Sequence, residues 1–534
     1  MQTDMQEYSS QIRRRRTFAI ISHPDAGKTT LTEKLLLYGG AIQMAGSVRA
    51  RRSQRQATSD WMELERQRGI SITSTVLQFE FEGYVLNLLD TPGHQDFSED
   101  TFRTLMAADS AVMLIDKAKG VEEQTRKLFH VCRRRGIPIF TFINKLDRPG
   151  RDPLDLMAEL EDALGIHSTA MNWPIGDGPD FRGIYDLASR EVHLFERAEH
   201  GSRRAGVKVT DLADPALGEL IGRSQHDQLR EEIELLEAAG ERLDRDRVSR
   251  GDLTPVYFGS ALTNFGVELF LRSFIEMAPP PAPRMSDSGL VRPEDEEFRG
   301  FIFKVQANMD PRHRDRMAFL RIVSGKFERD MAVFHPRLGR TVRLTRPQKL
   351  FGQEREVAEE GYPGDIIGLT NPGVFTIGDT VCTGQPVRFR EFPHFPPEHF
   401  AVLRNTRVDR YKQFLKGIQQ LSEEGVIQLF YERDAARREP IVGVVGRLQF
   451  DVVRYRLETE YGVETAMEDT PFRLARWLRV PPDDGHNILW TTGSKHVEDA
   501  EGNPAALFNG DWYLNYMQEK NPGLELLETS RELG

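Results

Sequence analysis

Cysteine is scarce in this sequence, with two residues among 534. Cys132 and Cys382 lie far apart and in no metal-ligand spacing, which excludes a disulfide framework and indicates a reducing compartment. Long apolar runs are also lacking, and the run that follows Arg13–Arg16 is too short for the core of a signal peptide. We therefore expect a soluble, cytoplasmic protein that does not associate with a membrane.

An excess of positive charge is absent as well. The 71 Lys and Arg residues are outnumbered by 82 Asp and Glu residues, which gives a formal net charge of −11. This balance argues against a simple basic nucleic-acid-binding domain, although it leaves room for a local basic face. With 534 residues, of which 39% are hydrophobic, the chain is long enough for several globular domains.

One glycine is missing from an otherwise recognisable phosphate-binding loop. The pattern G-x-x-x-x-G-K-[ST] occurs as S-H-P-D-A-G-K-T, starting at Ser22, between a short apolar run and a helix-like segment. Gly27 lets the backbone approach phosphate closely, Lys28 can reach the outer phosphates, and Thr29 can place its hydroxyl on magnesium. Taken alone, the loop is explained equally well by a chance Gly-Lys-Thr at the start of a helix.

A second apolar segment, 84–90, ends in an aspartate. The carboxylate of Asp90 can hold magnesium through water, as the second acidic motif of a nucleotidase does. Thr91 and Pro92 lead to Gly93, which stands where a switch loop offers its amide to the terminal phosphate and can change conformation cheaply.

Two more apolar segments end in motifs suited to a guanine base. The third is followed by Asn-Lys-Leu-Asp, in which Asp147 can accept from the two N–H groups that distinguish guanine from adenine. Asn144 can hydrogen-bond the base edge, and the stem of Lys145 can lie over the ring. The fourth is followed by Ser260 to Leu262, where backbone amides can meet the guanine oxygen. An isolated copy of either motif would be read as a polar turn.

Four strand-end motifs in the order of a guanine-nucleotide site have a chance probability of about 1 in 100 or less. The sequence therefore predicts a site for GTP and GDP. Its predicted residues are Ser22, His23, Pro24, Asp25, Ala26, Gly27, Lys28, Thr29, Asp90, Thr91, Pro92, Gly93, His94, Asn144, Lys145, Leu146, Asp147, Ser260, Ala261 and Leu262.

The phrases "DAGKTT", "QRGISIT", "DTPGHQDF", "NKLD" and "GSAL" resemble the translational GTPases. Members of that group often replace the first loop glycine, as Ser22 does here. The resemblance implies a GTPase in which Thr29, Ser71 and Asp90 hold Mg²⁺. It places the phosphate-sensing hydroxyl of the first switch at Ser71, although Thr73 lies two residues later and is an alternative.

The same resemblance assigns a catalytic role to His94, which follows Asp-Thr-Pro-Gly directly. A histidine at this position orients the attacking water and stabilises charge during hydrolysis, and a partner can act as the trigger by moving it. An aspartate at the position of Asp25 helps to hold the loop and its ions, although a plain polar turn explains that residue almost as well.

The succession of sequence patterns along the chain predicts a multidomain α/β protein. A P-loop GTPase domain is expected at 1–278, as a doubly wound, mostly parallel sheet with an inserted subdomain at about 165–250 that resembles the one in elongation factor G. A proline-rich linker occupies 279–298. Period-2 alternation with Gly and Pro turns predicts a β-barrel domain at 299–390, and mixed helix and strand patterns predict an α+β sandwich domain at 391–534.

Two helices are expected in the last of these regions. The first covers 410–425, and the second carries Leu448, Val452 and Tyr455 on one face. We interpret these helices as core elements rather than binding motifs. The residues from 470 to 534 have no assigned role.

The phrases "QANMDPRHRDR" and "LQFDVV", together with "DTPGHQDFSEDTFRTL", resemble the peptide chain release factor 3 family, which are class II release factors of bacteria. The resemblance extends over most of the chain. It implies a monomeric, ribosome-activated GTPase that drives the codon-reading (class I) release factor off the ribosome after peptide release and is reset by GTP hydrolysis.

Two other readings stay open. The chain could be another ribosomal GTPase, such as a translocase-like or rescue factor, or a nucleotide-gated binding protein whose hydrolysis is incidental. An acidic protein on a ribosome needs local basic patches, and Arg312, Arg314 and Arg316 are candidates, although an exposed arginine run is more often a solvated surface.

Overall fold

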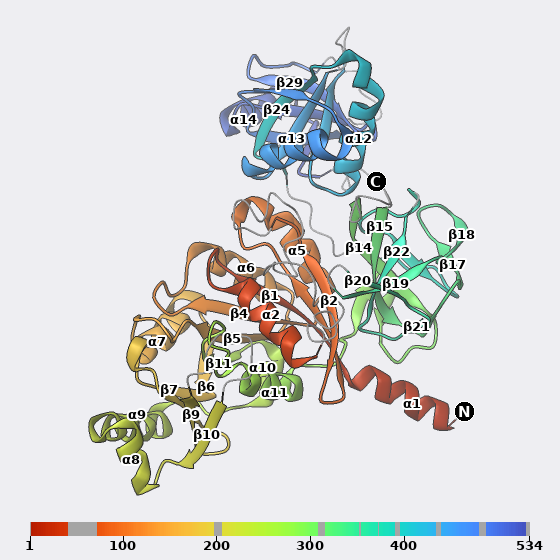
Figure 1. Ribbon diagram of the computed structural model, residues 1–534. Coiled ribbons are helices and arrows are strands. Elements are labelled where there is room, and N and C mark those ends of the chain that lie inside the picture. Colours follow the sequence, from red (N-terminus) through yellow and green to blue (C-terminus); the bar gives the residue numbers. More distant parts are fainter. Residues whose placement is uncertain are drawn as a thin grey trace.

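A computed structural model describes residues 2–40, 72–196, 206–307, 316–351, 354–371, 373–389, 396–433, 439–479 and 488–529. Ser71, Arg312 and Arg314 lie outside these ranges. Figure 1 shows three regions that follow one another along the chain: an N-terminal domain at the lower left, a second domain at the right and a third domain at the top.

The N-terminal domain is built on a sheet whose strands are parallel except for β2, in the order β2-β3-β1-β4-β5-β11-β6. Strand β4 is buried along its whole length, as are most residues of its neighbours, because helices cover both faces of the sheet. The strands are β1 (Arg15–Ser22), β2 (Thr75–Phe81), β3 (Tyr84–Asp90), β4 (Ser110–Asp116), β5 (Ile139–Asn144), β6 (His167–Ala170) and β11 (Leu253–Phe258).

Two apolar layers join the helices to this sheet. On one face, Leu31, Leu35 and Phe274 pack under α2 and α11; on the other, Leu105 and Phe129 pack under α5 and α6. This doubly wound arrangement is the predicted one. The helices are α1 (Gln2–Arg13), α2 (Lys28–Tyr38), the 3-10 turn η1 (Gln95–Phe97), α5 (Ser98–Ala107), α6 (Glu123–Arg134), α7 (Pro153–Leu164), α10 (Arg245–Arg250) and α11 (Val267–Met277).

A small antiparallel sheet in the order β10-β9-β8-β7 leaves the main sheet after β6 and returns through helices to β11. It extends to the lower left in Figure 1. Its elements are β7 (Asn172–Ile175), the turn η2 (Gly178–Asp180), β8 (Gly183–Asp186), β9 (Glu191–Glu196), β10 (Gly206–Asp211), α8 (Pro215–Ile221) and α9 (Arg223–Ala239).

The second domain is antiparallel throughout its described strands, around a core that includes Ile302, Leu320 and Ile367. A short hairpin, β12 (Arg284–Ser286) with β13 (Gly289–Val291), precedes it inside the segment predicted as a linker. The strands are β14 (Arg299–Ala307), β15 (Arg316–Ser324), β16 (Phe327–Glu328), β17 (Ala332–His335), β18 (Arg340–Arg343), β19 (Pro347–Phe351), β20 (Glu354–Val357), β21 (Glu360–Gly361), β22 (Ile366–Thr370) and β23 (Thr380–Cys382).

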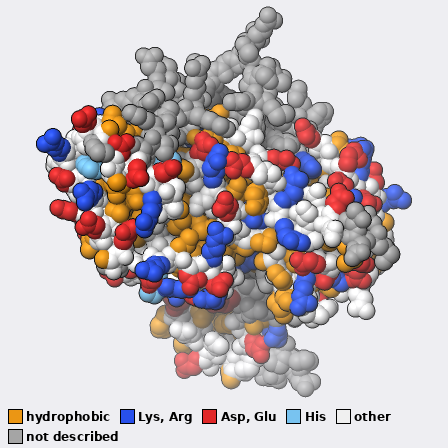
Figure 2. Space-filling view, turned by 90° about the horizontal axis from the view of Figure 1, so that it is seen from below, with side chains coloured by type: hydrophobic (Ala, Val, Ile, Leu, Met, Phe, Trp, Pro, Cys, Tyr) orange, Lys and Arg blue, Asp and Glu red, His pale blue; other side chains and the backbone are white. Residues whose placement is uncertain are grey.

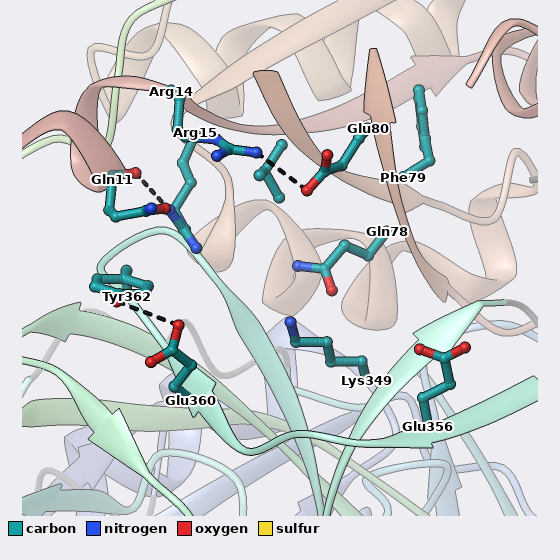
Figure 3. A pocket seen from close by; sticks show the side chains of 11 residues that line it. Gln11, Arg14, Arg15, Gln78, Phe79, Glu80, Lys349, Glu356, Glu360 and Tyr362 are labelled. Carbon is teal, nitrogen blue, oxygen red and sulfur yellow. Dashed lines mark hydrogen bonds and ion pairs between the residues drawn. The ribbon is translucent and has the colours of Figure 1, made fainter. Parts of the chain in front are cut away.

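The first two domains meet at a seam where β19 pairs with β2 through the single register pair Phe351↔Leu77. A cavity of about 300 Å³ lies beside this seam. Figure 3 shows side chains of both signs around it, with Arg14 pointing to Glu80 and Tyr362 to Glu360. Charges of both signs line the cavity, so it offers no preference for a cation or an anion.

The third domain is a sheet in the order β27-β24-β26-β25-β29-β30-β28-β31. Helices α12 and α13 pack on the core that contains Leu403, Phe414 and Leu457, and α14 packs on a second cluster around Met517. The elements are β24 (His399–Asn405), the turn η3 (Val408–Arg410), α12 (Tyr411–Glu423), β25 (Gln428–Glu432), β26 (Pro440–Val444), α13 (Leu448–Tyr461), β27 (Thr465–Asp469), β28 (Leu474–Arg479), β29 (Ser494–Asp499), β30 (Pro504–Phe508), α14 (Asp511–Lys520) and β31 (Glu525–Leu527).

Within the described ranges, no helix combines the length and the apolar character that crossing a bilayer requires. The face of the molecule seen from below carries acidic and basic side chains intermixed, with apolar side chains between them (Figure 2). That face therefore presents no extended surface of one sign.

Candidate functional site

The loop between β1 and α2 has the geometry of an anion site. Gly27 has a φ of 96° and directly precedes the first residue of α2. A Cβ at Gly27 would lie 2.4 Å from Nδ2 of Asn144, so both the conformation and the space require glycine. Backbone N–H groups at the start of α2 are left without partners in their own helix and favour an anion there.

Lys28 and Asp90 meet beneath this loop. The distance from Nζ of Lys28 to Oδ1 of Asp90 is 2.5 Å, and the two side chains are 7% and 2% exposed. Each buried charge compensates the other. The hydroxyl of Thr91 donates to the carbonyl of Ile20 at 2.6 Å, which fixes the end of β3 to β1.

Asn144 connects the phosphate loop to the fourth motif. Its Nδ2 donates to the carbonyl of Ala26, and its Oδ1 accepts from the N–H of Ala261, both at 2.9 Å. The side chain is buried. One amide thus holds together two loops that are far apart in the sequence.

Lys145 has a left-handed backbone, with a φ of 73°. Its Nζ donates to the carbonyl of Asp25 at 2.5 Å and to Oδ2 of Asp116 at 2.7 Å. Burial raises the pKa of Asp116, but hydrogen bonds from Lys145 and the N–H of Ala118 outweigh it and hold that pKa below its usual value. Asp116 was not among the predicted residues, although it ends β4 as Asp90 ends β3.

Asp147 lies against the fourth motif. Ser260 donates from its hydroxyl to Oδ1 of Asp147 at 2.5 Å, and the same hydroxyl accepts from the N–H of Thr263. Leu146 is fully buried, whereas 56% of Leu262 is exposed. The third and fourth motifs are therefore brought together at the carboxyl ends of β5 and β11, as the strand order requires.

A cavity of about 310 Å³ lies between the phosphate loop and the segment after β3. It places Gly93, His94 and Lys145 of the predicted set beside the loop, together with Thr30 and Arg148, which the motifs did not identify. Its lining residues are Ser22, His23, Pro24, Asp25, Gly27, Lys28, Thr29, Thr30, Gly93, His94, Lys145 and Arg148.

Two histidines lie at this cavity. Burial lowers the pKa of His23, although Glu122 at 3.6 Å opposes the effect, and neither ring nitrogen of His23 has a hydrogen-bond partner among the described residues. His94 is 30% exposed, and its Nδ1 accepts from the N–H of Asp96 at 3.2 Å. The same nitrogen lies 3.4 Å from Oδ1 of Asp96.

The residues at the cavity fit a magnesium nucleotide. Thr29 supplies a hydroxyl at the cavity, and Asp90, paired with Lys28 beneath the loop, supplies a carboxylate. These are the oxygen donors that Mg²⁺ prefers. No cluster of three or more His, Cys, Asp or Glu side chains suited to a metal occurs in the described part of the chain.

Ser71, the predicted switch hydroxyl, lies outside the described residues. The alternative, Thr73, lines a different cavity of about 50 Å³, between the three domains. The next residue is held firmly: the N–H of Ser74 donates to Oδ2 of Asp100 at 2.6 Å, and Nζ of Lys304 donates to the Ser74 hydroxyl at 2.9 Å. The choice between Ser71 and Thr73 stays a prediction.

Three protein-family models match successive parts of the chain. Residues 13–280 match the Elongation factor Tu GTP binding domain, residues 297–384 match Elongation factor G domain 2, and residues 389–518 match the Class II release factor RF3, C-terminal domain.

Similar curated proteins cover nearly the whole chain. Peptide chain release factor 3 of Gloeobacter violaceus is 59% identical over 521 residues, which are 97% of this chain and 98% of the relative. The protein of the same name from Symbiobacterium thermophilum is 56% identical over 529 residues, covering 99% of this chain and 100% of the relative. The one from Synechococcus elongatus is 57% identical over 531 residues, covering 98% of this chain and 95% of the relative.

Among solved structures, the crystal structure of ttk003000868 from Thermus thermophilus is similar, with a TM-score of 0.67 at 23% identity. The match covers 91% of this chain and 72% of that one. At this identity the likeness shows a shared fold.

Proposed function

The chain belongs to the peptide chain release factor 3 family, and from this premise we propose that it acts on the ribosome at translation termination. It is a GTPase, and its first 280 residues contain the matching nucleotide-binding domain. On the ribosome, its GTP-bound form promotes departure of the class I release factor after peptide release. Hydrolysis of GTP then lowers its affinity for the ribosome and resets the cycle.

The proposal rests on two features that occur together in this chain. The guanine-type site joins Asn144, Asp147 and Ser260 at the strand ends. The third domain matches a family of class II release factors. A guanine site alone would fit any translational GTPase. The third domain distinguishes the termination factor from the other members of that group.

The loop residues supply the phosphate site. Gly27 lets the backbone N–H groups of the loop approach the phosphates closely. When nucleotide binds, the ammonium group of Lys28 leaves Asp90 and pairs with the phosphates. Thr29, Asp90 and the hydroxyl of Ser71 or Thr73 would hold Mg²⁺, and the ion would supply charge neutralisation on the phosphate oxygens.

The base site selects guanine through Asp147, which accepts from the N–H groups of that base. Ser260 fixes the orientation of the Asp147 carboxylate through its hydroxyl. Lys145 covers the base with its stem while its Nζ remains tied to Asp116.

His94 orients the attacking water. Because Asp96 engages Nδ1, Nε2 is the ring nitrogen left to contact the water. Hydrolysis depends chiefly on positioning and charge stabilisation, so the ribosome activates the reaction by placing His94. We further propose that the chain works as a monomer in the cytoplasm.

The test uses ribosomes stalled after peptide release with a labelled class I release factor bound. Addition of this chain with GTP is expected to accelerate departure of the label. A label that stays bound while the chain hydrolyses GTP on the same ribosomes would remove the termination role and leave a ribosomal GTPase of another kind.

The His94→Ala variant separates binding from turnover. We expect it to bind GTP as the parent does and to lose ribosome-stimulated hydrolysis by about 100-fold or more. Unchanged turnover would remove His94 from the catalytic machinery.

A further inference from the structure

The outward side of η3 and α12 in the third domain exposes large apolar side chains. Val408 is 90% exposed, Tyr411 51% and Leu415 41%. Their spacing of three and four residues places them on one stripe. An adjoining side of α12 buries Phe414 and Leu421 in the core of the third domain, and the ring centroid of Tyr411 lies 6.3 Å from that of Phe414. The stripe therefore borders the core yet stays exposed, and exposed apolar side chains rimmed by polar ones mark interaction sites.

Basic residues flank the stripe. The segment from Arg407 to Lys416 contains four basic residues and one acidic residue, in a chain whose formal net charge is −11. Asp409 lies 3.1 Å from Arg407 and 3.6 Å from Arg410. A second acid, Glu464, acts on Arg407 from the neighbouring segment. Even with both acids counted, positive charge is in excess.

Lys412 and Lys416 are one helical turn apart on the exposed side of α12. Neither makes an ion pair with another residue of the described ranges. Like charges at this spacing repel each other and weaken the helix. Exposed apolar area and repulsion between lysines, both unfavourable, thus occur at the same place on the chain. A polyanionic partner with flat apolar surfaces would reduce both, because its charges would pair with the lysines and its apolar surfaces would cover the stripe.

Two other exposed arginines of the third domain are paired with acids. Arg404 is bonded to Glu439 and Glu468, and Arg447 to Asp469. The face in Figure 2 likewise intermixes the two signs. The cations around α12, by contrast, outnumber the acids beside them.

We propose that this α12 face, comprising Arg407, Val408, Arg410, Tyr411, Lys412, Leu415 and Lys416, binds RNA. The cations meet phosphates, and the exposed ring of Tyr411 stacks on an unpaired base. RNA fits better than an acidic protein because an aromatic ring between cations serves both the bases and the backbone of one strand. The inference rests on the proposed function, which brings the chain to the ribosome, and names one surface that meets ribosomal RNA there.

The first test measures binding of the full chain to purified ribosomes with a non-hydrolysable GTP analogue, over a series of salt concentrations. We expect the double variant Lys412→Ala with Lys416→Ala to bind about tenfold more weakly, with a slope of log affinity against log salt that is smaller by about 1 to 2. Tyr411→Ala should weaken binding without changing the slope, and Tyr411→Phe should restore it.

A matched control removes two cations elsewhere. Lys326 and Arg329 of the second domain are 40% and 48% exposed and are paired with acids, so the double variant Lys326→Ala with Arg329→Ala should leave both affinity and slope unchanged. Thermal melting and GDP binding establish that every variant is folded. If the α12 variants bind ribosomes like the parent, this inference fails while the proposed function stands. If the parent itself does not bind ribosomes, both fail.

The second test identifies the partner. A photoreactive phenylalanine analogue placed at position 411 is irradiated on the ribosome. Crosslinks to ribosomal RNA support the proposal. Crosslinks to ribosomal protein alone, or none at all, overturn it.

Discussion

The carboxylate of Asp96 caps a helix of another domain. Its Oδ2 accepts from the backbone N–H of Leu448, the first residue of α13, at 2.7 Å. Arg447, which precedes the helix, provides no side-chain cap of its own. The first N–H groups of a helix have no partner within it, so the N-terminal domain supplies an acceptor that the third domain lacks. Asp96 follows His94 by two residues, and this contact links the segment that carries His94 to the third domain.

Substitution of Asp96 should loosen this link. Asp96→Ala removes the cap at a cost of about 1 kcal/mol, so hydrogen exchange at the amide of Leu448 should accelerate about fivefold. Asp96→Asn keeps an acceptor oxygen and should preserve most of the protection. Equal exchange in the two variants would show that the bond is absent in solution.

Gly446 tests the same contact from the other side. A Cβ there would lie 2.2 Å from Cγ of Asp96, and overpacking of this kind costs about 1–3 kcal/mol. Gly446→Ala should therefore expose the Leu448 amide to exchange. The matched control is Gly510→Ala in the same domain, where nothing lies within 4 Å of the new methyl group. Similar exchange in both variants would contradict the geometry.

The phosphate loop should not tolerate a side chain at Gly27. Gly27→Ala combines a left-handed backbone with a methyl group 2.4 Å from Nδ2 of Asn144. The backbone strain alone costs about 1–2 kcal/mol, so GDP affinity should fall by more than tenfold. Gly40→Ala is the control, because its φ is also positive but nothing lies within 4 Å. A fluorescent GDP analogue measures both, and equal affinities would refute the role of the clash.

The buried ion pair between the first two domains should contribute more than an exposed one. Arg321 and Asp109 are each 1% exposed and lie 2.5 Å apart. Burial lowers the pKa of Arg321 to about 10, although Asp109 raises it. Arg321→Met leaves Asp109 with Arg284 at 3.3 Å and should cost about 3 kcal/mol. Arg329→Met, which breaks an exposed pair, should cost about 0–1 kcal/mol. Calorimetric melting points in the reverse order would contradict this account.

The two thiols should be inert in the folded chain. Burial raises the pKa of Cys132 to about 12, against a smaller opposing effect of Arg135, and burial also raises that of Cys382. Because the raised pKa keeps Cys132 protonated, its thiolate should be about one part in ten thousand at pH 8. A thiol reagent should react with neither cysteine until denaturant is added. The exposed variant Ser288→Cys is the control and should react at once; rapid labelling of the parent would refute the burial of the thiols.

The strand-end motifs could be predicted because the carboxyl ends of parallel strands meet at one edge of a sheet. Asp90 and Asn144 end β3 and β5, and the packing places both beside the phosphate loop. The bridging role of Asn144 could not be predicted, because its partners Ala26 and Ala261 are more than a hundred residues away.

The two faces of α13 show a different limit. Leu448, Val452 and Tyr455 were interpreted as core residues, yet they pack on Ile72 and Phe97 of the N-terminal domain. An apolar stripe has the same periodicity whether it covers its own domain or a neighbouring one. The pattern therefore predicted burial and could not identify the partner.

The pairing of β2 with β19 has a consequence for the solubility of the chain. Strand β2, with the sequence TVLQFEF, is the last strand of its own domain's sheet, and β19 pairs with its outer edge at Leu77. An uncovered strand of this composition is a template for association with other chains. The second domain thus protects the first against self-association. If a step of the cycle separates the two domains, the edge of β2 must pair with another segment, or the separation must end before two molecules collide.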